Sequence, residues 1–266
     1  MNEPVVLHEV DARGVARVTL NRPEVNNAYN GALIDGLLEV FGSLAADDRV
    51  RLVIIRANGR HFQAGADLAW IRSVSTQDAG IGLEVSRRTA LAVRGLNEFA
   101  KPTIALIQGA CIGGGTGIAA ACDVVIASSD AFFAISEARW GLAAQIIFPQ
   151  LNAAIGARNV RRYALSCERF DARTAREIGL VHEVCDTGGL DAAAAPIIEG
   201  LLMAAPEALV ATKRSIMACA GDVVSDTQLQ TLVAEHAARR RTAEASEGLA
   251  SFVEKRNPAW FPGPAG

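Results

Sequence analysis

Residues 101–123, KPTIALIQGACIGGGTGIAAACD, decide how the rest of the chain is arranged. An apolar run, Thr103–Ile107, comes first, followed by three consecutive glycines at 113–115 and then by small apolar residues up to Cys122. This order predicts a buried strand, a tight loop and a helix. Glycine lets the bare backbone approach a ligand, and the first amides of a helix have no partner within it. The stretch is therefore suited to donating N–H groups to an oxygen atom.

The composition of the 266-residue chain is typical of a globular protein of one domain, with or without a small appendage. Half of the residues are hydrophobic, the net charge is −3 and the mean hydropathy is +0.21. The slightly negative net charge is not that of a nucleic-acid-binding protein, which carries an excess of basic residues. No apolar run is long enough to span a membrane. The five cysteines are scattered, and the N-terminal residues lack the basic flank and apolar core of a signal peptide. We expect a cytoplasmic protein with free thiols and neither a nucleic-acid nor a membrane partner.

Strands and helices alternate up to about residue 185, and the remainder of the chain is predicted to be helical. Apolar, β-rich runs predict strands at 5–10, 15–20, 50–57, 103–107, 124–127, 131–135 and 181–184. Helical spacing predicts helices at 33–44, 77–99, 146–156, 160–166, 174–178, 192–203, 207–219 and 227–247. We therefore divide the chain into a strand-rich core, 1–190, and a helical region, 191–266.

Two segments share one pattern of apolar strand, glycine-containing loop and helix. They are LVIIRANGRHFQAGADL at 52–68 and TIALIQGACIGGGTGI at 103–118. Two similar β-to-α units side by side would present backbone amides at the same end of a sheet. Together the two loops could form an oxyanion hole, provided that a base and a carbonyl substrate are present.

Two other interpretations of the glycine stretch remain open. A flexible linker is disfavoured because apolar core segments flank it directly. A dinucleotide site is suggested because Gly115, Gly117 and Ala120 satisfy G-x-G-x-x-A, with Glu137 about 20 residues further on. However, the predicted helix is short for a Rossmann crossover and lies deep in the chain.

Six segments in a fixed order carry a family resemblance. They are LNRPEVNNAYN (20–30), HFQAGADL (61–68), the stretch 101–123, FFAISEARWGL (132–142), FDARTAREIGLVHEV (170–184) and SFVEKRNPAW (251–260). As a set they resemble the crotonase, or enoyl-CoA hydratase/isomerase, superfamily over nearly the whole chain. The resemblance implies an α/β spiral of ββα units with a C-terminal helical trimerisation region, 191–266. It also implies a homotrimer or a dimer of trimers, and an acyl-CoA substrate whose coenzyme A is not a separate cofactor.

The resemblance also implies a catalytic set. Carried over by position, the backbone amides of Ala66 and Gly114 form the oxyanion hole, and Glu137 is a catalytic carboxylate. The amides would stabilise the negative charge that develops on the thioester oxygen. The carboxylate would move a proton, and apolar neighbours such as Phe133 would raise its pKa towards the working pH. The alternative for Glu137 is a helix-capping role behind Ser136.

Further residues match positions that hold coenzyme A in the family. Ala64, Asp67 and Leu68 would lie along the adenine and the pantetheine. Phe252 and Lys255 match positions from which a neighbouring subunit's tail helps to hold coenzyme A. The four histidines have no metal-ligand spacing, so we expect no metal site.

Gly117 is the main departure from the family pattern. Ordinary hydratases of the family carry a second catalytic glutamate at this position. The amino-acid sequences of residues 113–128 and 162–184 are most similar to one branch of the family. Its members have glycine at the position of Gly117 and hydrate methylglutaconyl-CoA or isohexenylglutaconyl-CoA. The sequence therefore predicts a hydro-lyase that adds water to a branched or carboxylated 2-enoyl-CoA in acyl-CoA catabolism. Gln145 could orient a water and so replace part of the second glutamate, or it could be a surface or packing residue.

Other activities remain as alternatives. The first is a Δ3,Δ2-enoyl-CoA isomerase with Glu137 as its single base. A nicotinamide-dependent oxidoreductase and a non-catalytic assembly are more remote. Arg87, Arg88 and Arg139 could each pair with a substrate carboxylate, and the sequence does not select among them.

Overall fold

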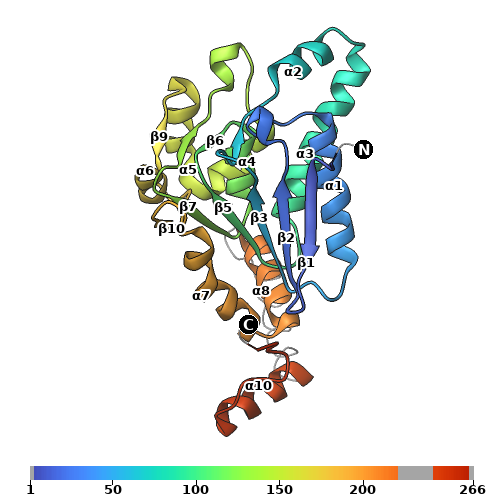
Figure 1. Cartoon of the computed structure of the whole chain (residues 1–266), viewed down its shortest axis with the longest axis vertical. Coiled ribbons are helices and arrows are strands. Elements are labelled where there is room, and N and C mark those ends of the chain that lie inside the picture. Colours follow the sequence, from blue (N-terminus) through green and yellow to red (C-terminus); the bar gives the residue numbers. More distant parts are fainter. Residues whose placement is uncertain (1–2, 221–241, 264–266) are drawn as a thin grey trace.

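The computed structural model describes residues 3–220 and 242–263, and in these ranges two β-sheets run through the molecule (Figure 1). The larger sheet has the strand order β1 (Val6–Val10), β2 (Val15–Leu20), β3 (Leu52–Ala57), β5 (Thr103–Ile107), β7 (Val124–Ser128) and β10 (Glu183–Cys185). The smaller sheet has the order β4 (Gln63–Ala64), β6 (Ala110–Ile112), β8 (Phe132–Ala134) and β9 (Phe170–Asp171). The pairs β1–β2 and β8–β9 are antiparallel, and the other neighbouring strands are parallel.

Helices surround the sheets and extend below them (Figure 1). The α-helices are α1 (Gly31–Ala46), α2 (Leu68–Ser75), α3 (Ala79–Asn97), α4 (Gly114–Ala121), α5 (Phe148–Ser166), α6 (Ala172–Glu177), α7 (Leu190–Met203), α8 (Pro206–Cys219) and α10 (Ala243–Glu254). Three short 3-10 helices are η1 (Pro23–Val25), η2 (Glu137–Trp140) and η3 (Gln145–Ile147). No single helix in the described ranges is long and apolar enough to cross a membrane; only the sharply bent pair of α7 and α8 has that length and composition.

A strand of the large sheet, a strand of the small sheet and a helical segment follow one another three times. The first unit is β3, β4 and the helices α2 and α3; the second is β5, β6 and α4; the third is β7, β8 and the segment from η2 to α5. Because β4 and β6 are parallel neighbours, the loops that follow them leave the small sheet at the same end. The two loops that the sequence pairs, with AG and GGG, are therefore adjacent.

Alternate residues of the large sheet pack on its two faces. In β3, Val53 and Ile55 belong to the main core with α1, α3, α4 and α5, whereas Leu52 and Ile54 belong to a second cluster with Leu202 of α7. Both faces are thus covered. A strand buried on both sides has an uninterrupted apolar sequence, which is why the sequence predicts these strands well.

The structure departs from the predicted elements in a few places. The predicted helices 146–156 and 160–166 are one helix, α5, bent at Gly156, where φ is +71°. The helix α2 and the short strands β4, β6 and β9 were not predicted; β6 lies where the sequence predicted only a tight loop between β5 and α4. Of the predicted helix 227–247, the part before residue 242 lies outside the described residues. The division at residue 190 stays a prediction; α7 begins at this residue and still packs on the large sheet.

Candidate active site

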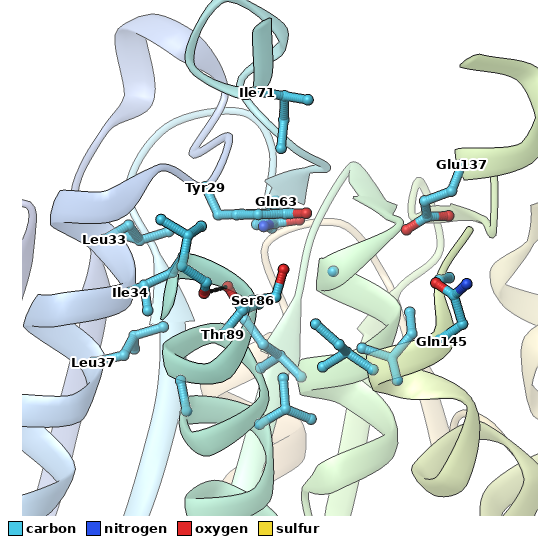
Figure 2. Close-up of a pocket in the computed structure, with 18 of the residues that line it drawn as sticks. Tyr29, Leu33, Ile34, Leu37, Gln63, Ile71, Ser86, Thr89, Glu137 and Gln145 are labelled. Carbon is cyan, nitrogen blue, oxygen red and sulfur yellow. Dashed lines mark hydrogen bonds between the residues drawn. The ribbon is translucent and has the colours of Figure 1, made fainter. Parts of the chain in front are cut away.

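A cavity of about 540 Å³ lies between α1, α3 and the start of α4 (Figure 2). Its wall is mainly aliphatic and aromatic, and it extends inwards to Phe41, Ile55 and Leu96 of the main core. The side chains with polar groups in the wall are Tyr29, Gln63, Trp70, Ser86, Thr89, Glu137 and Gln145. Among the described residues, Glu137 is the only charged side chain that lines the cavity. In the part of the chain that the structure describes, one carboxylate therefore faces an otherwise uncharged cavity.

The structure brings most of the predicted catalytic set to this cavity. Gly114 and Glu137 line it directly. Ala66 is half-buried and is not part of the wall, although Tyr29, with which it pairs, is.

Tyr29 fixes the loop that carries Ala66. Its N–H donates to the carbonyl of Gly65 over 2.9 Å, and its own carbonyl accepts from the N–H of Asp67 over 2.9 Å. These two bonds form a parallel bridge on either side of Ala66 and leave the N–H of Ala66 unused. Within the part of the chain that the structure describes, neither Ala66 nor Gly114 donates its backbone N–H to another residue.

Two of the three consecutive glycines make room for side chains of the cavity. A Cβ atom at Gly113 would lie 2.7 Å from Oε1 of Glu137, and Gly113 also has φ of +55°, which favours glycine. A Cβ atom at Gly114 would lie 2.9 Å from Cε1 of Tyr29. The missing Cβ atoms thus let the carboxylate and the phenol ring approach the start of α4.

Gly115 and Gly117, further along α4, also leave room for neighbouring side chains. A Cβ atom at Gly115 would lie 2.9 Å from Oε1 of Gln63. At Gly117 it would overlap Cγ2 of Ile147 and lie 2.8 Å from Cβ of the same residue. Ile147 therefore occupies the space into which a side chain at position 117 would project.

This packing disfavours the dinucleotide interpretation. Gly115 and Gly117 of the G-x-G-x-x-A match are buried inside α4 against Gln63 and Ile147, so their backbone is covered by protein side chains. In residues 3–220 and 242–263, no group of three or more His, Cys, Asp or Glu side chains is placed to hold a metal ion.

Burial sets the protonation of Glu137. Loss of solvent raises the pKa of this carboxyl group, and hydrogen bonds from the backbone N–H groups of Glu137 and Ser136 oppose the rise. Its Oε2 atom is buried and has no hydrogen-bond partner among the described residues. Burial, and then the charge of Glu137, raise the pKa of Tyr29 to about 12, so the phenol stays protonated. Figure 2 shows the hydroxyl of Tyr29 directed towards Glu137 across the cavity.

The residues predicted to contact coenzyme A lie outside the cavity wall. Ala64 ends β4, and Leu68 is exposed at the first turn of α2. The carboxylate of Asp67 caps α2 by accepting from the N–H of Trp70 over 3.2 Å, and it pairs with Arg22 over 3.3 Å. Capping by Asp67 fixes the helix that begins next to the predicted coenzyme A site. Contact with coenzyme A stays a prediction for these three residues.

The predicted C-terminal contacts are far from the cavity of their own chain. Lys255 follows α10, which lies at the opposite end of the molecule from α2 and α3 (Figure 1). The side chain of Phe252 lies outside the described residues. That a neighbouring copy of the chain brings these residues to the cavity is implied by the resemblance and stays a prediction.

The three candidate arginines are engaged elsewhere. Arg87 and Arg88 form ion pairs with Glu84 and Asp35, over 2.7 Å and 2.6 Å. Arg139 donates to a backbone carbonyl over 3.3 Å. None of the three lines the cavity, so these arginines do not offer a cation to a substrate carboxylate there.

Sequence reasoning missed Tyr29 and Gln63. Both lie in segments that carry the family resemblance, and Gln63 is a polar residue directly before AGAD in an apolar context. That break in the apolar run was the available signal. Their roles depend on packing against α4, which is about 50 to 85 positions further along the chain.

Comparisons with known proteins agree with this geometry. Residues 11–262 match the family model described as enoyl-CoA hydratase/isomerase. A 2,3-dehydroadipyl-CoA hydratase of Escherichia coli is 31% identical over 250 residues, which cover 92% of this chain and 94% of the relative. A mitochondrial Delta(3,5)-Delta(2,4)-dienoyl-CoA isomerase of Dictyostelium discoideum is 30% identical over 262 residues, which cover 95% of this chain and 89% of the relative.

A solved structure supports the fold. The crystal structure of an enoyl-CoA hydratase from Shewanella pealeana superposes with a TM-score of 0.92 at 34% identity, covering 96% of both chains. The crotonase-like fold that the sequence predicts is thereby confirmed. The chain belongs to the enoyl-CoA hydratase/isomerase family.

Proposed function

We propose that the protein adds water to the double bond of a 2-enoyl-CoA thioester with an uncharged acyl chain. The observation that carries this proposal is the placement of Glu137 and Gln145 in one wall of the cavity. They come from the neighbouring helices η2 and η3, and both side chains face the same region (Figure 2). Gln145 is exposed and its side chain makes no hydrogen bond to another described residue, so its amide is available to hold a water beside the carboxylate at the edge of the cavity.

One carboxylate is enough to balance the reaction. Glu137 takes a proton from the water as the hydroxyl oxygen bonds to C3 of the acyl chain. The electrons of the double bond move towards the thioester oxygen, where the N–H groups of Ala66 and Gly114 stabilise the negative charge. The protonated Glu137 then returns the proton to C2, and the product is a 3-hydroxyacyl-CoA. Gln145 orients the water and takes no proton.

The wall of the cavity favours an uncharged acyl chain. The sequence predicted a branched or carboxylated chain, but no Lys or Arg among the described residues lines the cavity. A buried carboxylate without a cationic partner is costly, whereas an alkyl chain, straight or branched, would pack against aliphatic side chains. We therefore retain a branched chain within the proposal and leave out the terminal carboxylate.

A second candidate is a double-bond isomerase, because Ile147 fills the place of a second carboxylate. In that reaction Glu137 would remove a proton from C2 of a 3-enoyl-CoA and return it to C4, and no water would be needed. The relatives include both a hydratase and an isomerase, so they do not discriminate between the two activities, and the choice depends on the residues of the site. Gln145 favours hydration, because its amide is available to hold a water near the base.

Product masses in ¹⁸O-labelled water test the proposal. We expect trans-2-octenoyl-CoA to lose its conjugated absorbance and to gain one labelled water. Gln145→Met should lower that rate by roughly tenfold, the effect of one lost hydrogen bond, while Gln77→Met, at an exposed glutamine outside the cavity, should leave it unchanged. Conversion of trans-3-octenoyl-CoA to the 2-enoyl isomer, with no label taken up from either substrate, would instead establish the isomerase.

A further inference from the structure

Gln63 is a buried polar residue between the two loops of the site. It is 1% exposed, and it begins β4, directly before the AGAD loop. Its Oε1 atom accepts from the N–H of Gly65 over 3.0 Å. Because an N–H group can only donate, this bond identifies which end of the carboxamide is oxygen. The nitrogen is therefore the end that points away from Gly65.

That nitrogen lies beside Gly114. It is 3.6 Å from the position of a Cβ atom built on Gly114, and Gln63 is part of the cavity wall. Among the residues that the structure describes, the nitrogen has no hydrogen-bond partner, although it is one end of a side chain that is almost completely buried. This donor opens onto the cavity, so its acceptor comes from a molecule in the cavity, either water or the substrate.

The carboxamide also spans the two halves of the proposed oxyanion hole. One end holds Gly65, which immediately precedes Ala66, and the other lies against the start of α4 at Gly114. Gly115 leaves room for it, since a Cβ atom there would lie 2.9 Å from Oε1. An uncharged alkyl chain has no acceptor, and the thioester oxygen is the acyl-CoA acceptor that would lie between the amides of Ala66 and Gly114, where the Gln63 nitrogen is.

We infer that the side-chain amide of Gln63 is a third hydrogen-bond donor to the thioester oxygen, beside the backbone amides of Ala66 and Gly114. The inference rests on the proposed function, because it requires a thioester in this cavity. The donor strengthens as negative charge develops on that oxygen, so its main effect is on kcat and less on KM. Gln63 is then a catalytic residue, and its role is not limited to holding the loop through Gly65.

A bound chromophore reports the donor directly. Hydrogen bonds to the carbonyl of 2,4-hexadienoyl-CoA draw electrons along the conjugated chain and shift its absorbance to longer wavelength. The shift is measured in a Glu137→Gln background, where the probe is not consumed, with and without Gln63→Met. We expect Gln63→Met to reduce the shift clearly, and in the otherwise wild-type enzyme to lower kcat by roughly ten- to a hundredfold with a smaller change in KM. Gln77→Met should change neither quantity.

A second variant separates donation from support of the loop. Gln63→Glu keeps an oxygen that accepts from the N–H of Gly65 and removes only the nitrogen donors. It therefore tests donation even if Gln63→Met fails to fold. We expect the same loss of shift and of kcat in this variant. Either variant, folded by circular dichroism and with full shift and kcat, overturns the inference. If the Glu137→Gln protein with Gln63 intact gives no shift at all, the proposed function fails instead.

Discussion

Gly117 and Ile147 show how one residue changes the chemistry of the site. Ile147 lies where a side chain at position 117 would project, so the wall is apolar at the point where ordinary hydratases have a carboxylate. In our proposal two uncharged side chains act in its place: Gln145, which lines the cavity with Glu137, and Gln63, which lies against Gly114. Glu137 is left as the only ionisable carboxyl group in the described wall.

The first prediction concerns Gly117→Ala. Glycine inside a helix usually costs about 1 kcal/mol relative to alanine, so the exchange should stabilise α4. Here the new Cβ atom would overlap Ile147, and we expect a loss of about 1–3 kcal/mol of unfolding free energy instead. Chemical denaturation measures it. Gly200→Ala in α7, whose Cβ atom would meet nothing within 4 Å, is the control and should gain stability. Equal gains in both variants would show that Ile147 does not fill this space.

The second prediction is the pH dependence of turnover. Glu137 must be ionised to accept a proton, and burial raises its pKa above the usual 4.5. The rate should therefore fall as pH falls through this raised pKa and level off above it. For stability the sign is opposite: an acid with a raised pKa in the folded state favours folding when protonated, and that contribution is lost as pH rises through the folded pKa. A pH profile of kcat/KM with its acid limb at or below 4.5 would contradict the burial of the working base.

At the scale of the elements, Asp123 joins α8 to the large sheet. Its Oδ2 atom accepts from the N–H of Thr103 over 2.8 Å, from the hydroxyl of Thr103 over 3.0 Å and from the Nζ of Lys213 over 2.7 Å. The carboxylate thus ties the start of β5 to the helix that follows α7. These bonds fix the N-terminal end of β5, the strand from which the chain continues to the glycine loop before α4.

The third prediction follows from this tie. Asp123→Ala removes three hydrogen bonds, and we expect a loss of about 1–3 kcal/mol in the free energy of unfolding. Lys213→Met should cost less, because the bonds to Thr103 remain. Arg173→Met serves as the control, since its ion pair with Glu177 is exposed and should contribute about 0–1 kcal/mol. If Asp123→Ala is no more harmful than Arg173→Met, the tie does not hold α8.

The sequence predicted the elements whose signal is local. The strands of the large sheet are apolar runs, and the loops before α2 and α4 carry the AG and GGG motifs. The strands β4 and β9 have two residues each, too few to show alternation. The functions of Gln63 and Ile147 depend on what they touch in α4, and no local pattern encodes such contacts. The catalytic roles of Ala66, Gly114 and Glu137 came from the resemblance and stay predictions.

At the scale of the whole molecule, the C-terminal part extends away from the cavity. The helix α10 lies at the far end of the chain in Figure 1, so Lys255 cannot reach the cavity of its own chain. Within the described part, α8 also leaves Ile216 63% exposed and Met217 41% exposed. These features agree with the expectation from the resemblance that other copies of the chain complete the site.

The fourth prediction is therefore the assembly. Sedimentation equilibrium should give three or six times the 28.0 kDa of one chain. A fully active monomer at assay concentration would contradict a contribution from the tail of a neighbouring subunit. In that case Phe252 and Lys255 would have no part in holding coenzyme A.

The most direct test of the account is the rate of Glu137→Gln on trans-2-octenoyl-CoA. A positioned acid–base group contributes about 10²–10⁴-fold, so we predict a fall in kcat of at least about 10²-fold. The variant should still bind 2,4-hexadienoyl-CoA and shift its absorbance, because the donors at Ala66, Gly114 and Gln63 remain. Glu84→Gln, which alters an exposed carboxylate paired with Arg87, should keep the wild-type rate. A Glu137→Gln enzyme that retains more than about a tenth of wild-type turnover would contradict the claim that this single carboxylate moves the proton.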